Sequence, residues 1–493
     1  MATTTNVTNY KTPGVYIQEI PVIPSSIVSV PTAVPVFVGY TQKAMQGIRP
    51  LAGMPFQIES MLDYTNYFGS AQPEPGLVVT IDNTVTPAAV TAAVDPTKQS
   101  KYLMYYAVQH YFDNGGSQCY ILSIGNYSNP VSATDYETNG VFCPILEQFT
   151  DITLIVCPDA LGLPIADTYY ALWNQVLIHC IKMQNRMAVL DLYRTPNNTW
   201  QQDVSHLRDG PNPAGGAGAV FSGLTVPAPN PENFKFGAVY FPRVWTTLIF
   251  NLDYTQIAVN FNPAASAIPN AATMDKLKTA NNQLYNQADS YLKNQLRMLL
   301  PAAPAMVGIY ANIDDTFGVW RAPANTPVID AVDVEVQVSA FDQEDLNVDA
   351  TSGMSINAIR SFPGRGPAIV WGARTLAGNV NEWRYISVRR FFFMVEQSIK
   401  NALEPFVFEP NDHNTWTKVT AMIATYLTEL WRAGALMGST TKDAFNIQVG
   451  IGLTMTPQDV LEGRMIVIVQ LAVVRPAEFI ILQFEQLMPP QQS

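Results

Sequence analysis

Proline spacing in the first forty residues restricts the local fold more strongly than any other feature of the sequence. The prolines at issue are Pro13, Pro21, Pro24, Pro31 and Pro35. Proline cannot occupy a helix interior and donates no backbone hydrogen bond to a sheet, so this density excludes a helix and a central strand. Residues 1–35 are therefore expected to form an extended N-terminal arm.

One β-prone run lies between these prolines, directly after the turn signal Thr12-Pro13-Gly14. Its residues are Val15, Tyr16, Ile17, Gln18, Glu19 and Ile20. A single strand is not stable alone in water. The run should therefore pair elsewhere in its own chain or add a strand to a neighbouring molecule.

The next part of the sequence alternates strand and helix patterns. Strands are expected at 36–39, 119–124, 152–157 and 187–192, and helices at 101–112 and 168–183. The strand–helix–strand spacing is typical of a βαβ unit and predicts a mixed α/β, or α+β, fold. Residues 41–100 and 195–240 are rich in proline and small or polar residues, and we expect them to form irregular insertions.

The second half of the chain shows longer periodic segments. Apolar spacing predicts helices over 274–300 and 387–403, and another beginning at Asn411–Asp412, which can cap it. Strands are expected over 331–340 and 465–474. A last strand is expected over Phe479, Ile480, Ile481, Leu482, Gln483, Phe484 and Glu485. This terminal apolar run would be an aggregation hazard if it stayed unpaired.

Composition excludes several classes of protein. The net charge of −12 argues against a nucleic-acid binder, which needs clustered lysine and arginine. Cys119, Cys143, Cys157 and Cys180 form no CxxC pair and are expected to be free thiols of a reducing compartment. The N-terminus lacks the pattern of a signal peptide, and the apolar stretch 465–474 is too short to span a bilayer. We therefore expect synthesis in the cytoplasm and no membrane insertion.

Catalytic motifs are not found in the sequence. There is no GxxxxGK[ST] loop, HExxH or GxSxG, and the histidines His110, His179, His206 and His413 are scattered. Gly215–Gly218 fits a flexible loop, because the full GxGxxG spacing is missing. The carboxylates Asp314–Asp315 and Glu344–Asp345 could form an acid/base pair but are expected in solvated loops. We therefore expect no cofactor, no metal and no enzyme.

Six sequence blocks, in a fixed order, resemble the phage tail sheath family. They are Gly308–Asn325, Asn357–Gly366, Val370–Leu376, Tyr385–Arg390, Phe408–Asn411 and Arg475–Phe479. Thr12–Tyr16 and Asn114–Gly116 also fit. The chain departs from the family at Pro301–Pro304, and residues 41–100 and 195–240 match no recognisable block.

The resemblance implies a helical polymer of stacked rings around an inner tube protein. It implies a domain plan of arm 1–35, outer or middle domain 36–350 with both insertions, inner tube-facing domain 351–475, and arm 476–493. The terminal arms would add strands to neighbouring subunits, and a baseplate trigger would release contraction without nucleotide. Partners would be further copies, alone or with paralogous subunits, the tube, and baseplate and terminator or cap proteins.

For the tube contact we expect the exposed faces of the two C-terminal helices, with Arg389, Lys400, Lys418 and Arg432 as candidates. The assembled particle would leave the cell as part of a phage tail, a tailocin or an extracellular injection particle. Two alternatives stay open. One is a soluble baseplate or adaptor component, and the other is an enzyme built on the α/β unit at residues 101–200.

Overall fold

The computed structural model describes residues 27–138, 142–209, 223–224 and 231–482. This part of the chain forms two compact units. Unit 1 contains residues 399–472 and unit 2 contains residues 29–398 together with the segment that begins at Val473. The mixed α/β fold class is confirmed, because helices and several sheets alternate along the chain.

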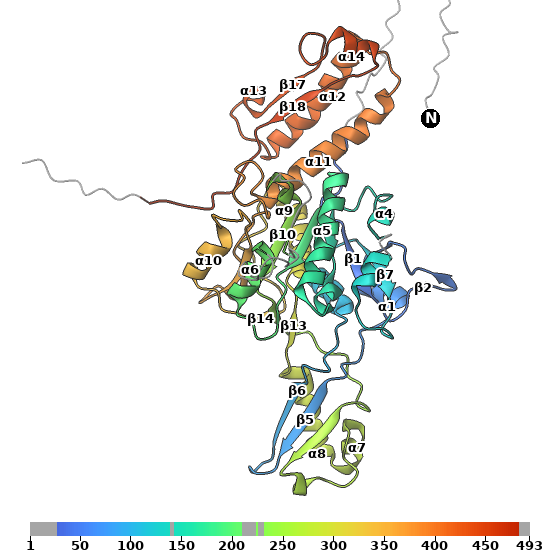
Figure 1. Ribbon diagram of the computed structural model, residues 1–493, viewed down its shortest axis with the longest axis vertical. Coiled ribbons are helices and arrows are strands. Elements are labelled where there is room, and N and C mark those ends of the chain that lie inside the picture. Colours follow the sequence, from blue (N-terminus) through green and yellow to red (C-terminus); the bar gives the residue numbers. More distant parts are fainter. Residues whose placement is uncertain (1–26, 139–141, 210–222, 225–230, 483–493) are drawn as a thin grey trace, which may run out of the picture. The chain divides into compact units, whose positions relative to one another are not determined.

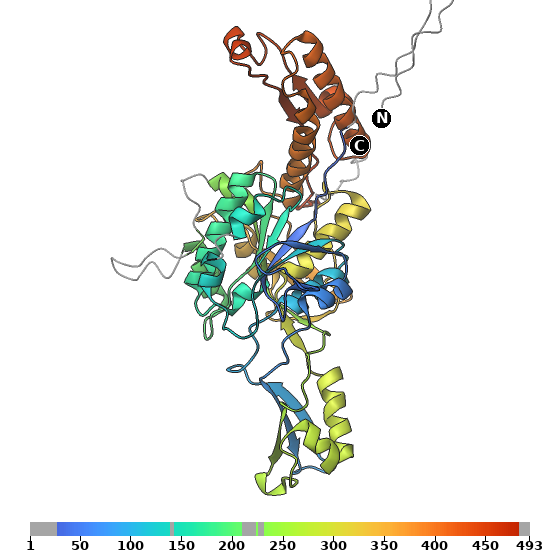
Figure 2. The same cartoon turned by 90° about the vertical axis from the view of Figure 1, so that its right-hand side faces the viewer.

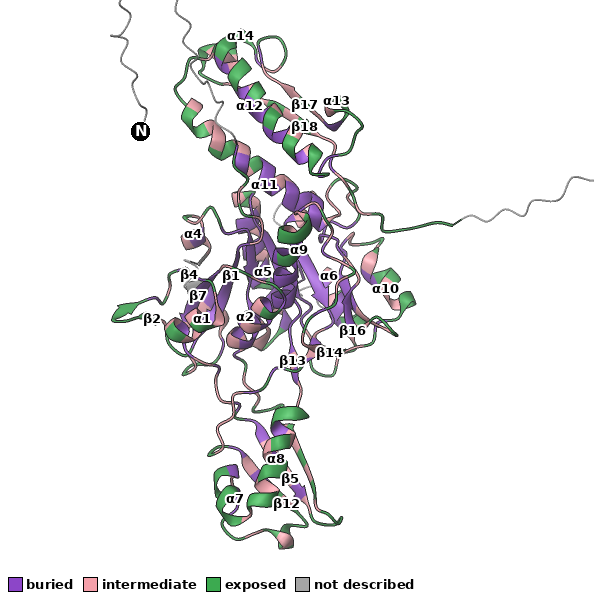
Figure 3. Cartoon of the chain, turned by 180° about the vertical axis from the view of Figure 1, so that it is seen from behind, coloured by how far each residue is buried: buried purple, intermediate pink, exposed green. Residues whose placement is uncertain are grey.

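An eight-stranded sheet is the centre of unit 2 (Figure 1). Its spatial order is β16 (Gly366–Val370), β15 (Asn357–Phe362), β10 (Gly237–Phe241), β9 (Met187–Asp191), β8 (Leu154–Val156), β1 (Pro35–Tyr40), β7 (Cys119–Gly125) and β4 (Phe56–Ile58). The six inner strands run parallel, and the edge strands β16 and β4 run antiparallel to their neighbours. Strands β1, β7, β8, β9 and β10 are almost fully buried, which explains their apolar sequences, whereas β15 is only partly buried over its last three residues (Figure 3).

Helices cover both faces of this sheet. Figure 2 shows α5 (Ala166–Met183) on one face and α2 (Met104–Asp113) with α9 (Ala303–Phe317) on the other. The remaining helices of unit 2 around the sheet are α1 (Met61–Phe68), α3 (Ala133–Thr138), α4 (Phe142–Leu146), α6 (Trp200–Asp209) and α10 (Ala340–Asn347). Helix α11 (Ile386–Leu403) begins in unit 2 and continues into unit 1.

Two segments expected to be irregular contain regular structure. Residues 77–82 (β5) and 89–94 (β6) join 258–262 (β12) in a separate three-stranded sheet. Helices α7 (Met274–Ala280) and α8 (Asn282–Asn294) pack beside it and bury Met274, Leu277 and Leu292 in a second hydrophobic core. The prediction that residues 195–240 form an irregular insertion is wrong at the C-terminal end of that range. Residues 237–241 form β10, a central strand of the main sheet.

The helix expected over 274–300 is also wrong. Asn281 leaves the helical conformation, with φ −154°, and its side chain caps α8 by accepting the Leu284 N–H at 3.1 Å. Asparagine favours such a cap over a helix interior. Residues 298–300 then form β13, which pairs with β11 (Val244–Thr246), and β11 also pairs with β14 (Ala331–Val334). A short ribbon joins β2 (Met45–Gln46) to β3 (Arg49–Pro50).

Unit 1 contains one long helix and a two-stranded sheet. Its elements are α12 (His413–Arg432), α13 (Thr441–Ala444), β17 (Phe445–Gln448), α14 (Pro457–Leu461) and β18 (Ile468–Leu471). The expected cap is confirmed, since Asp412 accepts the Thr415 N–H at 3.0 Å. The expected domain boundary at 350 lies inside unit 2, because β15 and β16 complete the main sheet and the unit border follows Ser398.

Two buried carboxylates close the carboxyl edge of the parallel strands. Asp159 accepts the Tyr40 N–H at 2.6 Å and the Met104 N–H at 2.9 Å, at the start of α2. Asp191 accepts the N–H groups of Ala302 and Ala303 at 2.6 and 3.1 Å, at the start of α9. Burial raises the pKa of each carboxyl to about 7, against the opposing effect of these donors.

Replacing Asp191 by alanine should destabilise unit 2 by about 2 kcal/mol, because two buried N–H groups lose their acceptor. Asp315→Ala, at the exposed end of the same α9, should change the unfolding free energy by less than about 0.5 kcal/mol. Urea unfolding followed by circular dichroism measures both. Equal effects of the two substitutions would contradict the capping role of Asp191.

Candidate functional site

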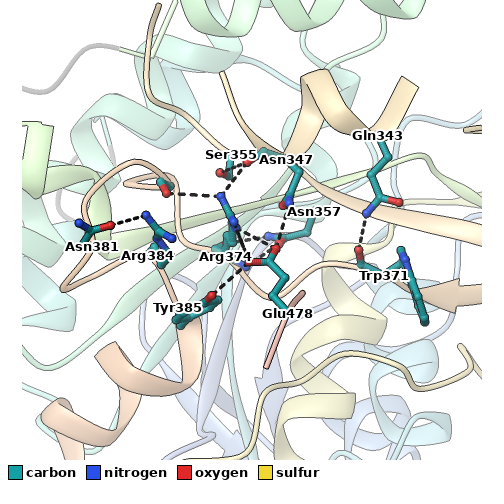
Figure 4. Close-up of polar contacts among 11 residues, drawn as sticks. Gln343, Asn347, Ser355, Asn357, Trp371, Arg374, Asn381, Arg384, Tyr385 and Glu478 are labelled. Atoms are coloured by element: carbon teal, nitrogen blue, oxygen red, sulfur yellow. Dashed lines mark hydrogen bonds and ion pairs between the residues drawn. The ribbon is translucent and has the colours of Figure 1, made fainter. Parts of the chain in front are cut away.

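An ion pair between a buried arginine and a partly exposed glutamate fixes the start of the C-terminal segment in unit 2 (Figure 4). Arg374 follows β16, and its side chain is only 3% exposed. Its Nε donates to Glu478 Oε1 at 3.0 Å and its Nη2 donates to Glu478 Oε2 at 2.6 Å. This two-point geometry matches the planar guanidinium to the carboxylate and gives a strong, directional contact. We call the Arg374–Glu478 pair the C-terminal clamp.

Neighbouring side chains support the clamp from several elements (Figure 4). Asn347, at the end of α10, donates to Glu478 Oε1 at 2.9 Å, and the Tyr385 hydroxyl donates to Oε2 at 3.1 Å. The Asn357 side chain accepts the Arg374 N–H at 2.7 Å and donates to the Val239 carbonyl at 3.1 Å. The clamp is therefore tied to the central strands β15 and β10.

The clamp also decides the ionisation of Glu478. Burial pushes the pKa of this carboxyl upward, but hydrogen bonds from Arg374 and Asn347 outweigh that effect. The net result is a pKa below the ordinary value for glutamate. Glu478 is therefore ionised, and the clamp is intact, at neutral pH.

A second buried arginine holds the base of the N-terminal segment. Arg390, on α11, contacts Asp314 of α9 through both terminal nitrogens, one at 3.0 Å, and donates to the Thr32 carbonyl at 3.0 Å. The Thr32 hydroxyl donates to Asp314 at 2.5 Å. Asp314 was expected in a solvated loop, and that expectation is wrong. It is the counter-ion of Arg390, and we call this contact the N-terminal clamp.

The two-stranded sheet of unit 1 has open edges. Strands β17 and β18 pair antiparallel, and α12 packs against β17. Within the described ranges, no third strand pairs with either of them. A two-stranded sheet is only marginally stable by itself. Its outer backbone groups can therefore accept further strands.

The expected arm strands have different outcomes. Val15–Ile20 and Gln483–Glu485 lie outside the described residues. Phe479–Leu482 form no strand with any described residue, and their side chains are 68–82% exposed. Four consecutive large apolar side chains in water are costly, so this run is a surface for a partner or for a fold-back contact.

The four candidate tube-facing residues differ in their exposure to solvent. Lys400, Lys418 and Arg432 are exposed in unit 1. The placement of Arg389 on an exposed face is wrong, because its side chain is 2% exposed. Its guanidinium lies 4.3, 4.9 and 5.0 Å from the ring centres of Phe393, Trp383 and Phe236. These cation–π contacts and the Glu396 carboxylate, 3.4 Å from Nη2, hold the guanidinium inside the fold, while its Nε has no hydrogen-bond partner among the described residues.

At the switch point of the α/β unit at residues 101–200, a carboxyl group of the chain itself lies where a ligand would be expected. Strand order 2-1-3-4-5, counted from β1, would place a ligand beside β1 and β8, where the neighbouring connections diverge. Asp159 fills this position with its own carboxylate at the start of α2. Gly39 allows the close approach, because a Cβ there would lie 2.5 Å from Asp159 Oδ2.

Metal binding and membrane crossing find no support in the part of the chain that the structure describes. Among those residues, no group of histidine, cysteine, aspartate or glutamate side chains is arranged to hold a metal ion. No helix in the same ranges has the length and apolar character needed to cross a bilayer.

The chain is similar to known sheath proteins over nearly its whole length. Residues 379–486 match the family model of the phage tail sheath C-terminal domain. The contracted helical sheath of the anti-feeding prophage is 29% identical, with 97% of this chain and 99% of that chain covered and a TM-score of 0.62. The contracted PVC sheath complex of an extracellular contractile injection system is also 29% identical, with 98% and 99% covered and a TM-score of 0.62.

A chain of the anti-feeding prophage baseplate structure is 29% identical as well, covering 97% of this chain and all of that chain, with a TM-score of 0.60. A comparison with curated proteins gives no match.

Glu478→Gln should release the C-terminal segment, because a neutral amide cannot reproduce the charged two-point contact. A loss of about 1.5 kcal/mol corresponds to roughly tenfold faster amide exchange over residues 474–482. Hydrogen exchange with mass spectrometry measures this. The matched control is Glu462→Gln, whose Arg464 partner is 57% exposed, and this control should leave exchange there unchanged.

Acid should open the same clamp. Because the folded-state pKa of Glu478 is lowered, its stabilisation is present above the unfolded-state pKa and is lost as pH falls through the folded-state value. Exchange of residues 474–482, corrected for intrinsic rates, should therefore stay slow at pH 7 and accelerate below about pH 4. The Glu478→Gln variant should lack this step, and a step of equal size in both proteins would contradict the assignment.

Proposed function

Because the chain belongs to the phage tail sheath family, we propose that it polymerises helically into a contractile sheath around an inner tube. It is a structural sheath subunit. The observation that carries the proposal is the likeness to two contracted sheaths over 97–98% of the chain. Both belong to injection particles, which favours such a particle over a phage tail as the destination of this subunit.

The arms are the proposed links between subunits. Val15–Ile20 of one subunit and Phe479–Glu485 of another would add strands to the open edges of β17 and β18 in a third. This addition would satisfy the outer backbone groups of the small sheet and bury the exposed run Phe479–Leu482. The contact is heterologous, so repetition gives an open helix of stacked rings.

The two clamps would allow the arms to transmit force between subunits. A strand held in a neighbour transmits force only if its base is fixed, and each base is fixed by a buried arginine–carboxylate pair. Contraction would then re-arrange units that stay connected by their arms. The energy would be stored at assembly in a metastable packing and released by the baseplate, without nucleotide. The outer domain over 36–350, and the inner, tube-facing position of residues 351–475, belong to the same proposal.

A second candidate is a subunit that sits at the baseplate. The 29% likeness to a chain of a baseplate structure favours it. Negative-stain microscopy of the purified protein separates the two, since a sheath subunit gives striated hollow tubes and a baseplate component gives dispersed particles or single rings. Assembly would take place in the bacterial cytoplasm before release of the particle, and the remaining partners would be baseplate and cap proteins.

Deleting residues 1–20 should abolish tube formation while leaving a folded monomer, because the deletion removes the arm strand and leaves the N-terminal clamp at Thr32 in place. The matched control deletes residues 1–9 and keeps Val15–Ile20, so it should still form tubes. Negative-stain microscopy and analytical ultracentrifugation give the readout. Normal tubes from the longer deletion would rule out the arm model.

Charge reversal at the exposed basic residues should weaken the grip on the tube. The triple variant Lys400→Glu, Lys418→Glu and Arg432→Glu should retain less co-purifying tube protein, while the arms still join subunits. Lys98→Glu, in the loop after β6, is a matched control with an exposed charge and should bind the tube normally. If the triple variant retains as much co-purifying tube protein as the unsubstituted chain, these exposed basic residues do not form the tube contact.

A further inference from the structure

An open groove of about 1190 Å³ lies beside the C-terminal clamp in unit 2. Its walls are the end of α9 with the following loop, helix α10, and the residues after β16. Gln343 of α10 donates to the Trp371 carbonyl at 2.6 Å and so joins two of these walls (Figure 4). The rings of Phe317, Trp320 and Trp371 and the side chain of Val348 give the groove a largely apolar surface.

Part of this apolar surface is open to solvent in the part of the chain that the structure describes. Phe317 and Val348 are each 50% exposed, and Phe341 on the neighbouring turn of α10 is 76% exposed. The Arg321 guanidinium covers one side of the Phe317 ring, 4.1 Å from its centre. An exposed apolar area of this kind marks a docking site more often than a solvated surface. An occupant should therefore be mainly apolar, although the lining also includes Arg321, Arg360, Glu344 and Asp345.

The C-terminal segment begins at the rim of the groove. Residues 474–480 form one of its walls, and Glu478 is the last residue held by the clamp. Beyond it, Phe479–Leu482 are 68–82% exposed, and the sequence continues with Phe484, Leu487 and Met488. The ten residues 479–488 can extend over about 35 Å, which is enough to turn and lie along the walls.

We propose that residues 479–488 fold back into this groove in the unassembled subunit and leave it when the segment pairs with a neighbouring subunit. A segment tethered at the rim has an effective concentration in the millimolar range. It therefore outcompetes the same segment of a second copy in dilute solution. The exchange rests on the proposed function, whereas the fold-back contact itself does not.

The fold-back contact would protect the apolar segment in the period before assembly. A free apolar strand with unpaired edges invites aggregation before assembly. The groove shelters the side chains of the segment in the monomer, and the neighbour's sheet replaces that shelter in the polymer. The segment is covered both in the monomer and in the polymer. It can therefore be apolar enough to bind a neighbour without causing the monomers to aggregate.

Disulfide trapping tests the fold-back contact in the full chain. Leu482→Cys with Val348→Cys should give, on oxidation at low protein concentration, an intramolecular bond seen as a faster monomer band on non-reducing gels. The matched control pairs Leu482→Cys with Leu62→Cys, an exposed position on α1 beside the opposite edge of the main sheet, and should give none. A covalent dimer would assign the groove to a second copy and overturn the proposal, and so would the absence of any bond.

Amide exchange supplies a readout without cysteines. A variant that ends at Ile480 keeps the clamp and the described groove wall but lacks the rest of the segment, so residues 317–325 and 340–348 should exchange several-fold faster than in the full chain. Equal rates overturn the proposal, because they mean that the groove is empty or is filled by another part of the chain.

Polymerisation separates this proposal from the proposed function. The disulfide-locked subunit should form no tubes until it is reduced, and tubes formed by the locked subunit would overturn the exchange. If the bond forms but the reduced protein never makes tubes, the fold-back contact stands and the proposed function fails. If no bond forms but the deletion of residues 1–20 still abolishes tubes, the proposed function stands and this proposal fails.

Discussion

The ion pair of the buried Arg374 with Glu478 is the contact on which the rest of the C-terminal architecture depends. It binds a chain end to strand β15 through Asn357 and to helix α10 through Asn347. A buried guanidinium without its carboxylate would be costly, so the geometry holds only while Glu478 stays in place. The C-terminal segment thus has a fixed point at Glu478, and the described residues that follow it, Phe479–Leu482, are exposed.

The N-terminal segment is also fixed by a buried arginine and a carboxylate. Arg390 and Asp314 fix Thr32 against helices α11 and α9, directly before the first core strand. Both clamps lie in unit 2, whereas the open-edged sheet lies in unit 1.

The main sheet shows why an α/β scaffold does not imply an enzyme. Parallel strands usually leave a crevice at their carboxyl ends where the chain changes direction. Here Asp159 and Asp191 occupy the starts of helices α2 and α9, where a ligand anion could otherwise bind. The chain thus places its own carboxyl groups at these two helix starts.

The sequence by itself predicted strands β1, β7, β8 and β9, helices α2, α5, α11 and α12, and the family resemblance, because long apolar periodicity and ordered motifs are local properties. It also predicts two terminal arms, since prolines and a terminal apolar run do not depend on distant residues. Only the tertiary structure decided that β10 is central, that Asn281 breaks a helix, and that Arg389 is buried between aromatic rings while Arg374 and Arg390 form clamps. An arginine pattern on a helix says nothing about which distant carboxylate or ring meets it, because partners separated by about a hundred residues or more are brought together by packing alone.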